Sequence, residues 1–302
     1  MTKILISVFN GHKYIKNQIE SLKNQSFLSF ETIARDDGSS DDTVSILEQS
    51  GISVLKDQLG NLKPAQSFGV LLAASSASHV LCCDQDDVWL PQKLERMTNA
   101  MNRLESLHGS HTPILLHHDL EIVDADLKTI APSLWAWRGL DIERGSSLNR
   151  LLLQNVVTGC ALMANRALLD KALPLPKDVV MHDWWLALVA SSFGIVEAMP
   201  ETLVKYRQHG NNSLGARQFD ARFILQNLLG KATLKPSIEA RTAQAQAFLK
   251  RFENDLAPQQ LEAVRAFATL RDVSWLERRR RLSKYDFRLS GVLRNFIWWC
   301  SV

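Results

Sequence analysis

The sequence lacks three features that would place it in familiar protein classes. No apolar run reaches the roughly 18 residues that a membrane-spanning helix needs, and the chain begins directly with a short apolar run, so we expect no signal peptide. Its four cysteines, at positions 82, 83, 160 and 300, include no Cys-x-x-Cys pair, so neither a zinc site nor a disulfide framework is indicated. We therefore expect reduced, buried thiols in a cytoplasmic protein.

The third missing feature is a Gly-x-x-x-x-Gly-Lys-Ser/Thr phosphate loop, and the sequence also shows no internal repeat and no low-complexity segment. The missing loop weighs against a nucleotidyl or phosphoryl transferase. With 302 residues, of which 46% are hydrophobic and 22% charged, the chain is long enough to bury a sizeable core. These values suit one large domain with an appendage.

The most informative segment is Asp-Gln-Asp-Asp at residues 84–87, which follows a buried-looking run at residues 79–83. Three carboxylates at the mouth of a buried strand repel one another and lose hydration, which favours a hard cation among them. Asp84 and Asp86 can converge on Mg²⁺ or Mn²⁺, whose remaining positions would go to water and phosphate oxygens. This indicates a substrate with a diphosphate. Helix capping is the alternative, because Asp87 lies just before a predicted helix start.

The N-terminal part alternates between strand and helix patterns. Residues 3–8 form a short apolar run, followed by a turn and by apolar residues at helical spacing. A second strand at residues 30–34 leads into an acidic turn at residues 35–42, which offers an N-cap for another helix. In open parallel sheets, ligands bind beyond the carboxyl ends of the strands. We therefore expect Asn10, the acidic turn and residues 84–87 to face one crevice.

Several segments, in the expected order, resemble glycosyltransferase family 2, whose catalytic domain has the GT-A nucleotide-sugar-binding fold. They are Ser-Val-Phe-Asn at 7–10, Gln-Ser-Phe at 25–27, Asp-Asp-Gly-Ser at 36–39, Asp-Gln-Asp-Asp at 84–87 with Trp89, Pro91, Lys93 and Leu94 behind it, Thr-Gly-Cys at 158–160, Met-His-Asp-Trp-Trp-Leu at 181–186 and Tyr-Arg-Gln-His-Gly-Asn-Asn-Ser at 206–213. The last two resemble the branch often described as rhamnosyltransferase-like. The resemblance implies an α/β, Rossmann-like domain with a mostly parallel central sheet.

The resemblance also implies a site for a pyrimidine-nucleotide donor, a dTDP- or UDP-sugar. The main chain around Phe9 and Asn10 would cradle the base. Asp37, with Asp36 in support, would accept a hydrogen bond from the N3–H group of the base. Asp84 would lie on the ribose or on the metal.

The metal ligand of the family falls on Asp86, with Asp84 beside it, and the implied cofactor is Mg²⁺ or Mn²⁺. His209 resembles a histidine that reaches the metal or the diphosphate late in related chains. A simple turn is the alternative role for His209, because Gly210 follows it.

Asp183 matches the family's catalytic base, which deprotonates the attacking hydroxyl. It precedes Trp184 and Trp185 in an apolar helix pattern, so we expect it in the first turn or at the cap of that helix. Capping is the alternative role and is compatible with catalysis. Desolvation by the two tryptophans would raise the pKa of Asp183, whereas a helix N-terminus would lower it. The sequence does not decide whether the pKa of Asp183 is raised or lowered.

Three positions depart from the family pattern. Residues 7–10 lack the usual proline, and Arg35 stands where an apolar strand residue is frequent. His182 replaces the acidic residue that often precedes the catalytic aspartate, and it could hydrogen-bond an acceptor or only pack against it. The selectivity for the base and the identity of the acceptor are therefore open.

The pattern becomes helical from about residue 216 onward, with breaks expected at Pro236 and Pro258. We therefore expect a catalytic domain over residues 1–215 and a helical C-terminal region over residues 216–302.

The last 45 residues, 258–302, are basic, with nine Lys or Arg and four Asp or Glu, whereas the preceding residues have a net charge of −2. Four arginines at 278–281 and the aromatic cluster at 296–299 have the composition of a basic amphipathic segment at an anionic membrane surface. The alternative is a solvated arginine face whose aromatic residues pack on the catalytic domain. We expect no nucleic-acid partner, because no recognition motif accompanies the basic run.

The expected function is metal-dependent, inverting transfer of a sugar, with rhamnose as the first candidate, in surface polysaccharide synthesis. The acceptor would be a hydroxyl of a glycan or of a lipid-linked molecule. The expected location is the cytoplasm, with peripheral attachment to the inner face of the cytoplasmic membrane. A non-catalytic nucleotide-sugar-binding protein and a metal-dependent nucleotidyl or phosphoryl transferase are the alternatives.

Overall fold

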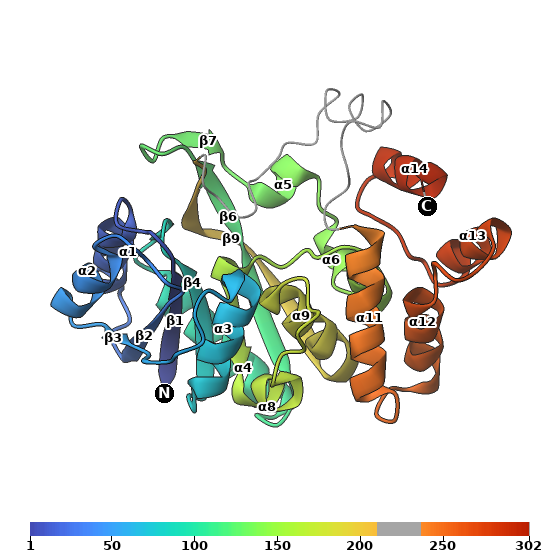
Figure 1. Ribbon diagram of the computed structural model, residues 1–302, viewed down its shortest axis with the longest axis horizontal. Coiled ribbons are helices and arrows are strands. Elements are labelled where there is room, and N and C mark those ends of the chain that lie inside the picture. The colour runs from blue at the N-terminus through green and yellow to red at the C-terminus, as the bar shows by residue number, and fades with distance from the viewer. Residues whose placement is uncertain (210–236, 302) are drawn as a thin grey trace.

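The computed structural model describes residues 1–209 and 237–301 (Figure 1). Strands and helices alternate in the N-terminal part, as the apolar runs and the turn residues between them predict. The elements of this part are β1 (Thr2–Val8), α1 (Ile15–Lys23), β2 (Phe30–Asp36), α2 (Thr43–Gln49), β3 (Ser53–Val54), α3 (Lys63–Ala74), β4 (His79–Asp84), β5 (Val88–Trp89) and α4 (Lys93–His108). The strands predicted at residues 3–8, 30–34 and 79–83 are confirmed as β1, β2 and β4.

Longer strands and shorter helices follow. They are β6 (Ile114–Val123), β7 (Thr129–Ala131), α5 (Leu134–Arg138), α6 (Ile142–Gly145), α7 (Leu148–Leu153), the 3₁₀ helix η1 (Gly159–Ala161), β8 (Leu162–Asn165), α8 (Arg166–Ala172), α9 (His182–Phe193) and β9 (Ile195–Arg207). The C-terminal helices are α11 (Ile238–Phe252), α12 (Pro258–Ala268), α13 (Trp275–Lys284) and α14 (Val292–Ser301).

The strands of the described chain form one sheet in the order β3-β2-β1-β4-β8-β6-β9-β5, and β7 pairs with β6. Strands β3, β2, β1 and β4 are parallel neighbours, and β6 is parallel to β9. Strand β8 is antiparallel to β4 and β6, and β5 is antiparallel to β9. The expected α/β fold is confirmed. The parallel arrangement holds where strand and helix alternate, and the sheet as a whole is mixed.

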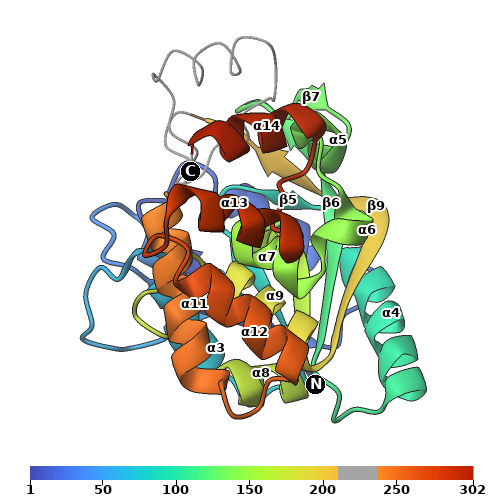
Figure 2. The same cartoon turned by 90° about the vertical axis from the view of Figure 1, so that its right-hand side faces the viewer.

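Helices cover both faces of the sheet. Successive side chains of a strand point to opposite faces, so one strand can contribute apolar residues to two clusters. In β1, Leu5 belongs to a buried cluster with residues of α3, α7, α9, α11 and α12. Its neighbours Ile4 and Ile6 belong to a second cluster with residues of α1 and α4. The sheet is thus buried between two layers of helices (Figures 1 and 2).

The C-terminal helices pack beside the helix layer that contains α9, at the end of the molecule away from β3 (Figure 1). Figure 2 shows α11 to α14 facing the viewer. Phe248 of α11 is fully buried, with its ring centroid 5.5 Å from that of Trp185. Pro258 is the first residue of α12, as the expected break there requires. The helical pattern predicted for residues 216–235, the break at Pro236 and the domain boundary near residue 215 lie outside the described residues.

Within residues 1–209 and 237–301, every helix is too short or too polar to cross a bilayer. Cys82, Cys83 and Cys160 are buried free thiols, as predicted.

Candidate active site

The carboxyl ends of β1, β2 and β4 lie side by side, because the three strands are parallel neighbours. Val8 at the end of β1 pairs with Asp36, and Ser7 pairs with Asp84. The loops that leave these strands therefore meet at one edge of the sheet, which is where open α/β sheets bind ligands.

Asn10 and Asp36 hold the first two loops together. Asn10 has a φ of 48°, its N–H donates to Ser39 Oγ at 2.8 Å, and its Oδ1 accepts from the N–H of Ser40 at 2.8 Å. The Asp36 carboxylate accepts from the N–H groups of Gly38 and Ser39 at 3.0 to 3.3 Å. Both side chains thus shape the loops, and their contact with a donor stays a prediction.

Asp37 is 4% exposed and strongly hydrogen-bonded. Its Oδ1 accepts from Arg35 Nη1 at 2.6 Å and from the N–H of Leu62 at 2.7 Å, and its Oδ2 accepts from the N–H of Lys63 at 2.9 Å. The buried Arg35 also binds Asp57, with Nε 2.8 Å from Oδ2. Arg35, which departs from the family pattern, therefore connects Asp37 to Asp57 in the loop after β3. Asp37 Oδ2 keeps a lone pair with which it can bind a ligand N–H.

Gln85 connects the β1 loop to the β4 loop, a role that the sequence did not indicate. Its Oε1 accepts from the N–H of Phe9 at 2.8 Å, and its Nε2 donates to the carbonyl oxygen of Phe9 at 3.0 Å. Gly11 leaves room for this amide, since a Cβ there would lie 2.3 Å from Gln85 Oε1. The main chain of Phe9 is thus already paired, and the residue is 47% exposed at the rim of the site.

Asp86 and His209, which the resemblance placed on the metal from distant parts of the chain, are in contact. His209 Nε2 lies 2.7 Å from Asp86 Oδ2. The His209 ring stacks on Tyr14 with 4.8 Å between centroids, and the guanidinium of Arg207 lies 4.6 Å from the centroid of the same Tyr14 ring. Residues 210–213 of the matching segment lie outside the described residues.

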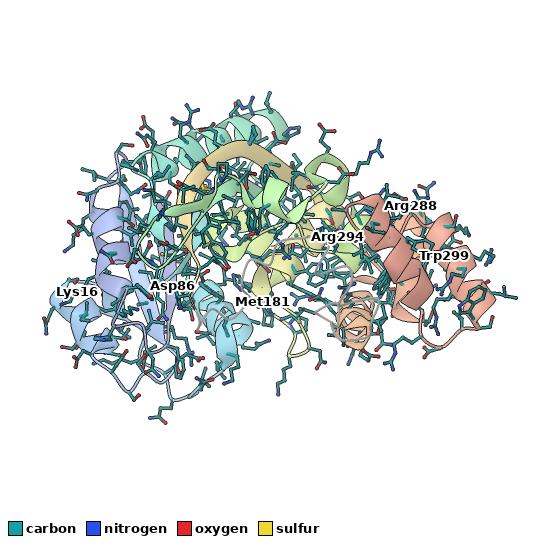
Figure 3. All side chains as sticks on the ribbon, turned by 90° about the horizontal axis from the view of Figure 1, so that it is seen from above. Lys16, Asp86, Met181, Arg288, Arg294 and Trp299 are labelled. Carbon is teal, nitrogen blue, oxygen red and sulfur yellow. The ribbon has the colours of Figure 1, made fainter. Side chains whose placement is uncertain are left out.

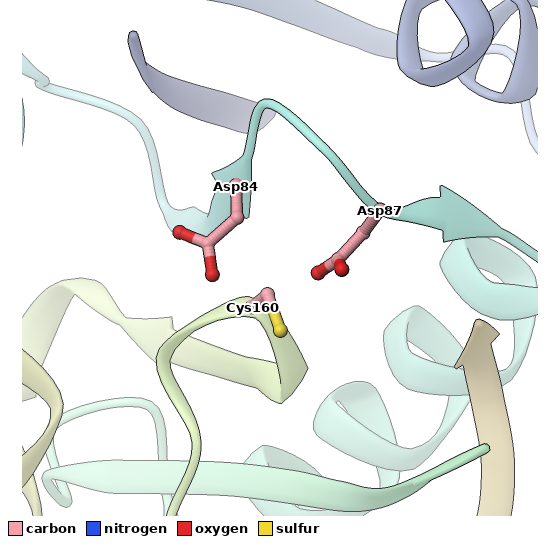
Figure 4. A group of neighbouring side chains, drawn as sticks. All are labelled: Asp84, Asp87 and Cys160. Carbon is pink, nitrogen blue, oxygen red and sulfur yellow. The ribbon is translucent and has the colours of Figure 1, made fainter. Parts of the chain in front are cut away.

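Asp84, Asp87 and Cys160 form a second acidic group, in which one ligand atom of each lies within 4.8 Å of the others (Figure 4). Burial and the charges of Asp86 and Asp183 raise the pKa of Asp84 to about 7, and burial and its acidic neighbours raise the pKa of Asp87 well above its usual range. Burial also raises the pKa of the Cys160 thiol, so this group is a neutral hydrogen-bond donor. Mutually repelling carboxylates of this kind suit a hard divalent cation.

Asp87 has a structural role that differs from capping. Its Oδ1 accepts from the N–H of Arg207 at 3.0 Å, and Arg207 Nε donates to the carbonyl oxygen of Asp86 at 2.7 Å. Helix α4 is preceded by Gln92, whose side chain makes no capping bond. The capping alternative for Asp87 is therefore wrong, and the residue joins the β4 loop to the end of β9.

Lys93 supplies a buried positive charge beside these acids. Its side chain is fully buried, with Nζ 2.6 Å from the carbonyl oxygen of Cys160 and 3.4 Å from the ring centroid of Trp89. Burial lowers the pKa of Lys93 to about 8, although the neighbouring thiols and carboxyl groups act in the opposite direction. The ammonium group offsets part of the repulsion among the aspartates.

Asp183 lies in the first turn of α9, as predicted, and is 6% exposed. Its Oδ1 accepts from Asn155 Nδ2 at 3.1 Å and from the N–H of Trp184 at 2.6 Å. Burial raises the pKa of Asp183 to about 7, and these hydrogen bonds only partly oppose it. Desolvation therefore outweighs the helix N-terminus. A carboxylate with a pKa near neutrality is well suited to act as a general base.

His182 packs inside the protein and does not reach out of the site. It is 1% exposed, its ring lies 4.2 Å from that of Phe68, and neither ring nitrogen has a hydrogen-bond partner in the described chain. Burial lowers the pKa of His182 to about 3, so the ring is neutral. The structure shows His182 packed against Phe68, and both roles considered for it, a hydrogen bond to an acceptor and packing against the acceptor, stay predictions.

Gly159→Ala is expected to distort this region. The added Cβ would lie 2.9 Å from His182 Nε2 and 3.6 Å from Asp183 Oδ2, and Phe68 prevents the His182 ring from moving away. We expect a loss of about 1–3 kcal/mol in the free energy of unfolding, measured by urea titration. Gly159→Ala combined with Phe68→Leu should recover part of it. Unchanged stability of the single variant would contradict the proposed crowding.

The chain is similar to known proteins in sequence and in fold. Residues 3–112 match the family model described as Glycosyl transferase family 2. An uncharacterized glycosyltransferase from Nostoc sp. is 27% identical over 221 residues, which are 70% of this chain and 65% of that protein. An uncharacterized glycosyltransferase from Haemophilus influenzae is 24% identical over 221 residues, covering 70% of this chain and 67% of that protein. The chain thus spans about two thirds of the length of these relatives.

Two solved structures share the fold. S. aureus TarS 1–349 in complex with UDP-GlcNAc has a TM-score of 0.59 and 17% identity, covering 94% of this chain and 80% of that chain. The mannosyltransferase PcManGT from Pyrobaculum calidifontis, in complex with GDP-Man and Mn²⁺, has a TM-score of 0.51 and 14% identity, covering 94% of this chain and 72% of that chain. Residues 3–112 therefore match glycosyl transferase family 2, and the chain has the expected GT-A fold, which it shares with these solved structures.

Proposed function

We propose that this protein is a metal-dependent glycosyltransferase, which moves a sugar, with inversion, from a pyrimidine-nucleotide donor to a hydroxyl acceptor. The observation that carries the proposal is the contact of His209 with Asp86 on the loop that follows Asp84, together with the charges of Asp86 and Asp183, which contribute to the raised pKa of Asp84. The acids would hold the donor's metal, and Asp183 would act on the acceptor.

On the donor side, Asp86 and Asp84 with His209 are the proposed ligands of Mg²⁺ or Mn²⁺. Carboxylate oxygens and an imidazole suit Mn²⁺, and carboxylates with phosphate oxygens suit Mg²⁺. PcManGT binds Mn²⁺ together with its nucleotide sugar, which supports a cation at the corresponding strand ends. When bound, the cation would stabilise the negative charge of the departing diphosphate.

The base of the donor would bind at Asp37. Within residues 1–209 and 237–301, its Oδ2 accepts one hydrogen bond, from the N–H of Lys63, and it can take a second one from the N3–H group of uracil or thymine. TarS binds UDP-GlcNAc, in keeping with a uridine donor, and a dTDP-sugar such as dTDP-rhamnose is the proposed alternative.

Asp183 is the proposed general base. It would take the proton of the acceptor hydroxyl while the acceptor oxygen bonds to the anomeric carbon and the bond to the diphosphate oxygen breaks. Asn155 and the N–H of Trp184 bind Oδ1, and the N–H of Gly159 also stabilises the carboxylate, so the proposed acceptor of the proton is a lone pair of Oδ2, which lies beside Gly159. General bases of this kind contribute about 10²–10⁴-fold to the rate.

The proposed acceptor is a hydroxyl of a glycan or of a lipid-linked molecule used for surface polysaccharides. Work on such an acceptor would take place at the inner face of the cytoplasmic membrane. The net charge of +5 over residues 258–302 supports this location, because that leaflet carries anionic lipids.

A thermal-shift screen of nucleotide sugars, with and without Mn²⁺, tests the donor assignment. We expect a UDP- or dTDP-sugar to raise Tm by a few degrees in the presence of Mn²⁺, because a ligand that binds only the folded state stabilises it. GDP-mannose serves as the purine control. Stabilisation that is equal in excess chelator, or that is strongest with the purine donor, would contradict the proposed site.

A further inference from the structure

The exposed apolar side chains of this protein gather on its last two helices. Six of the twelve large hydrophobic residues that are exposed in the described chain belong to α13 and α14. They form what we term the tail surface: Trp275 (56% exposed), Leu276 (74%), Val292 (89%), Leu293 (43%), Phe296 (60%) and Trp299 (45%). A patch of this kind marks a site of interaction.

Helix α14 has one buried side and one exposed side. Trp298 is 4% exposed, with its ring centroid 5.4 Å from the guanidinium carbon of Arg241 on α11. Val292, Phe296 and Trp299 follow one another at spacings of four and three residues, which places them on a common face. Because Trp298 packs inward, the face of α14 that carries Val292, Phe296 and Trp299 points outward.

Arg279 joins the two helices into one surface. It is 7% exposed, and its guanidinium carbon lies 4.7 Å from the ring centroid of Trp275 and 5.0 Å from that of Trp299. The two indole rings are 6.3 Å apart. The aromatic residues of α13 and α14 are thus fixed side by side, and the two helices present a continuous surface.

The tail surface lies in a strongly positive segment. Residues 275–299 contain seven Lys or Arg and two Asp or Glu, a net charge of +5. Both acids are already paired with arginines of the protein, Glu277 with Arg280 and Arg281, and Asp286 with Arg150 and Arg288. Figure 3 shows Arg288, Arg294 and Trp299 together at this end of the molecule, opposite Lys16.

We propose that the tail surface docks on an anionic lipid bilayer. Phe296, Trp299, Trp275 and Leu276 would enter the boundary between headgroups and acyl chains, and the arginines would contact lipid phosphates. Amphipathic helices that lie in the membrane interface bind in this way. Each Lys or Arg close to an anionic surface strengthens binding about fivefold. Lying on the bilayer also fits the described helices, which are too short or too polar to span it.

Charge favours a bilayer over two other occupants. A second copy of this chain, docked through the same surface, would bring two segments of net charge +5 against each other. A nucleic acid would use the arginines but would leave Leu276, Val292 and Phe296 in water. An anionic bilayer accommodates both the apolar and the positive groups.

Docking would place α13 and α14 at the headgroups of the leaflet in which the proposed lipid-linked acceptor lies. That consequence rests on the proposed function, whereas the binding of lipid does not.

Co-sedimentation of the full chain with vesicles, without donor or acceptor, tests the proposal. We expect binding to vesicles of phosphatidylcholine and phosphatidylglycerol, and much weaker binding to phosphatidylcholine alone or at high salt. Phe296→Ser with Trp299→Ser should lower the partition coefficient at least tenfold. The matched control, Leu28→Ser with Leu107→Ser, removes residues that are 73% and 68% exposed elsewhere and should bind as the original chain does.

A second variant keeps the apolar residues. Arg280→Gln with Arg288→Gln should weaken binding to the anionic vesicles about fivefold for each charge. Equal binding by the original chain and both tail variants would overturn the proposal. So would light scattering that shows a dimer which Phe296→Ser with Trp299→Ser converts to a monomer, because the tail surface would then contact a second copy. Failure of sugar transfer would leave the vesicle result unaffected, since it requires no turnover.

Discussion

Asp183→Asn is expected to lower kcat by ~10²–10⁴-fold while donor binding stays nearly unchanged. The amide cannot take a proton from the acceptor hydroxyl, yet its oxygen can still accept from Asn155 and from the N–H of Trp184. The fold around α9 should therefore survive. The measurements are steady-state kinetics and the Tm gain with a nucleotide sugar and Mn²⁺.

The pH profile provides an independent check on Asp183. A general base must be ionised, and the pKa of Asp183 is raised to about 7, so kcat should rise with pH up to about 7 and level off above it. The pKa of Asp84 is also about 7, but its ionisation should act mainly on donor binding and therefore on KM. The two ionisations can thus be distinguished, because that of Asp183 changes kcat and that of Asp84 changes KM.

Asp178→Asn is the matched control for Asp183→Asn, because it makes the same chemical change at an exposed position shortly before α9. It should leave kcat and Tm unchanged. Near-normal kcat in Asp183→Asn would mean that the base lies elsewhere. His182 is a poor substitute, since it is buried with a pKa of about 3.

The strand ends of the site could be predicted because their signals are local. The apolar runs before Asn10, Asp36 and Asp84 define strands, and parallel neighbours bring their carboxyl ends together. The position of Asp183 in the first turn of α9 was likewise evident from the helix pattern that follows it. What the sequence left open was its pKa, since this depends on burial by residues distant in the chain.

Contacts between distant segments gave no local signal. Asp87 accepts from the N–H of Arg207, 120 residues away, through a pairing of the two-residue strand β5 with β9. Gln85 binds the main chain of Phe9, but a glutamine in a loop is compatible with many roles. Arg35 was visible as a departure from the family pattern, but its partner Asp57 was not.

The orientation of the C-terminal helices also depends on contacts that the local sequence does not predict. Its composition indicated a basic region with aromatic residues, and left open whether these pack inward or face outward. Trp298 is buried against Arg241, whereas the next residue, Trp299, is 45% exposed. Adjacent residues of a helix point in different directions, so only the way in which α14 packs on α11 decides which tryptophan is available.

Asp86→Asn is expected to abolish most of the metal-dependent stabilisation by a nucleoside diphosphate and to lower turnover ~10²-fold or more. A neutral amide cannot balance the charge of the cation that Asp86, Asp84 and His209 are proposed to hold. The measurements are the Tm gain with UDP in the presence of Mn²⁺, and the rate of sugar transfer. Asp272→Asn, in the loop before α13, is the matched control and should behave as the original chain does.

The stability of the metal-free variant distinguishes a lost ligand from a damaged fold. The charge of Asp86 raises the pKa of both Asp84 and Asp87, so its removal relieves repulsion in the empty site. The amide oxygen of the Asp86→Asn variant can still accept from His209 Nε2, which lies 2.7 Å from Asp86 Oδ2 in the original chain. Asp86→Asn should therefore have an unchanged or higher Tm without metal, together with a lost response to Mn²⁺ and UDP. Full activity of the original chain in excess chelator would show instead that these acids serve the fold and that no cation takes part.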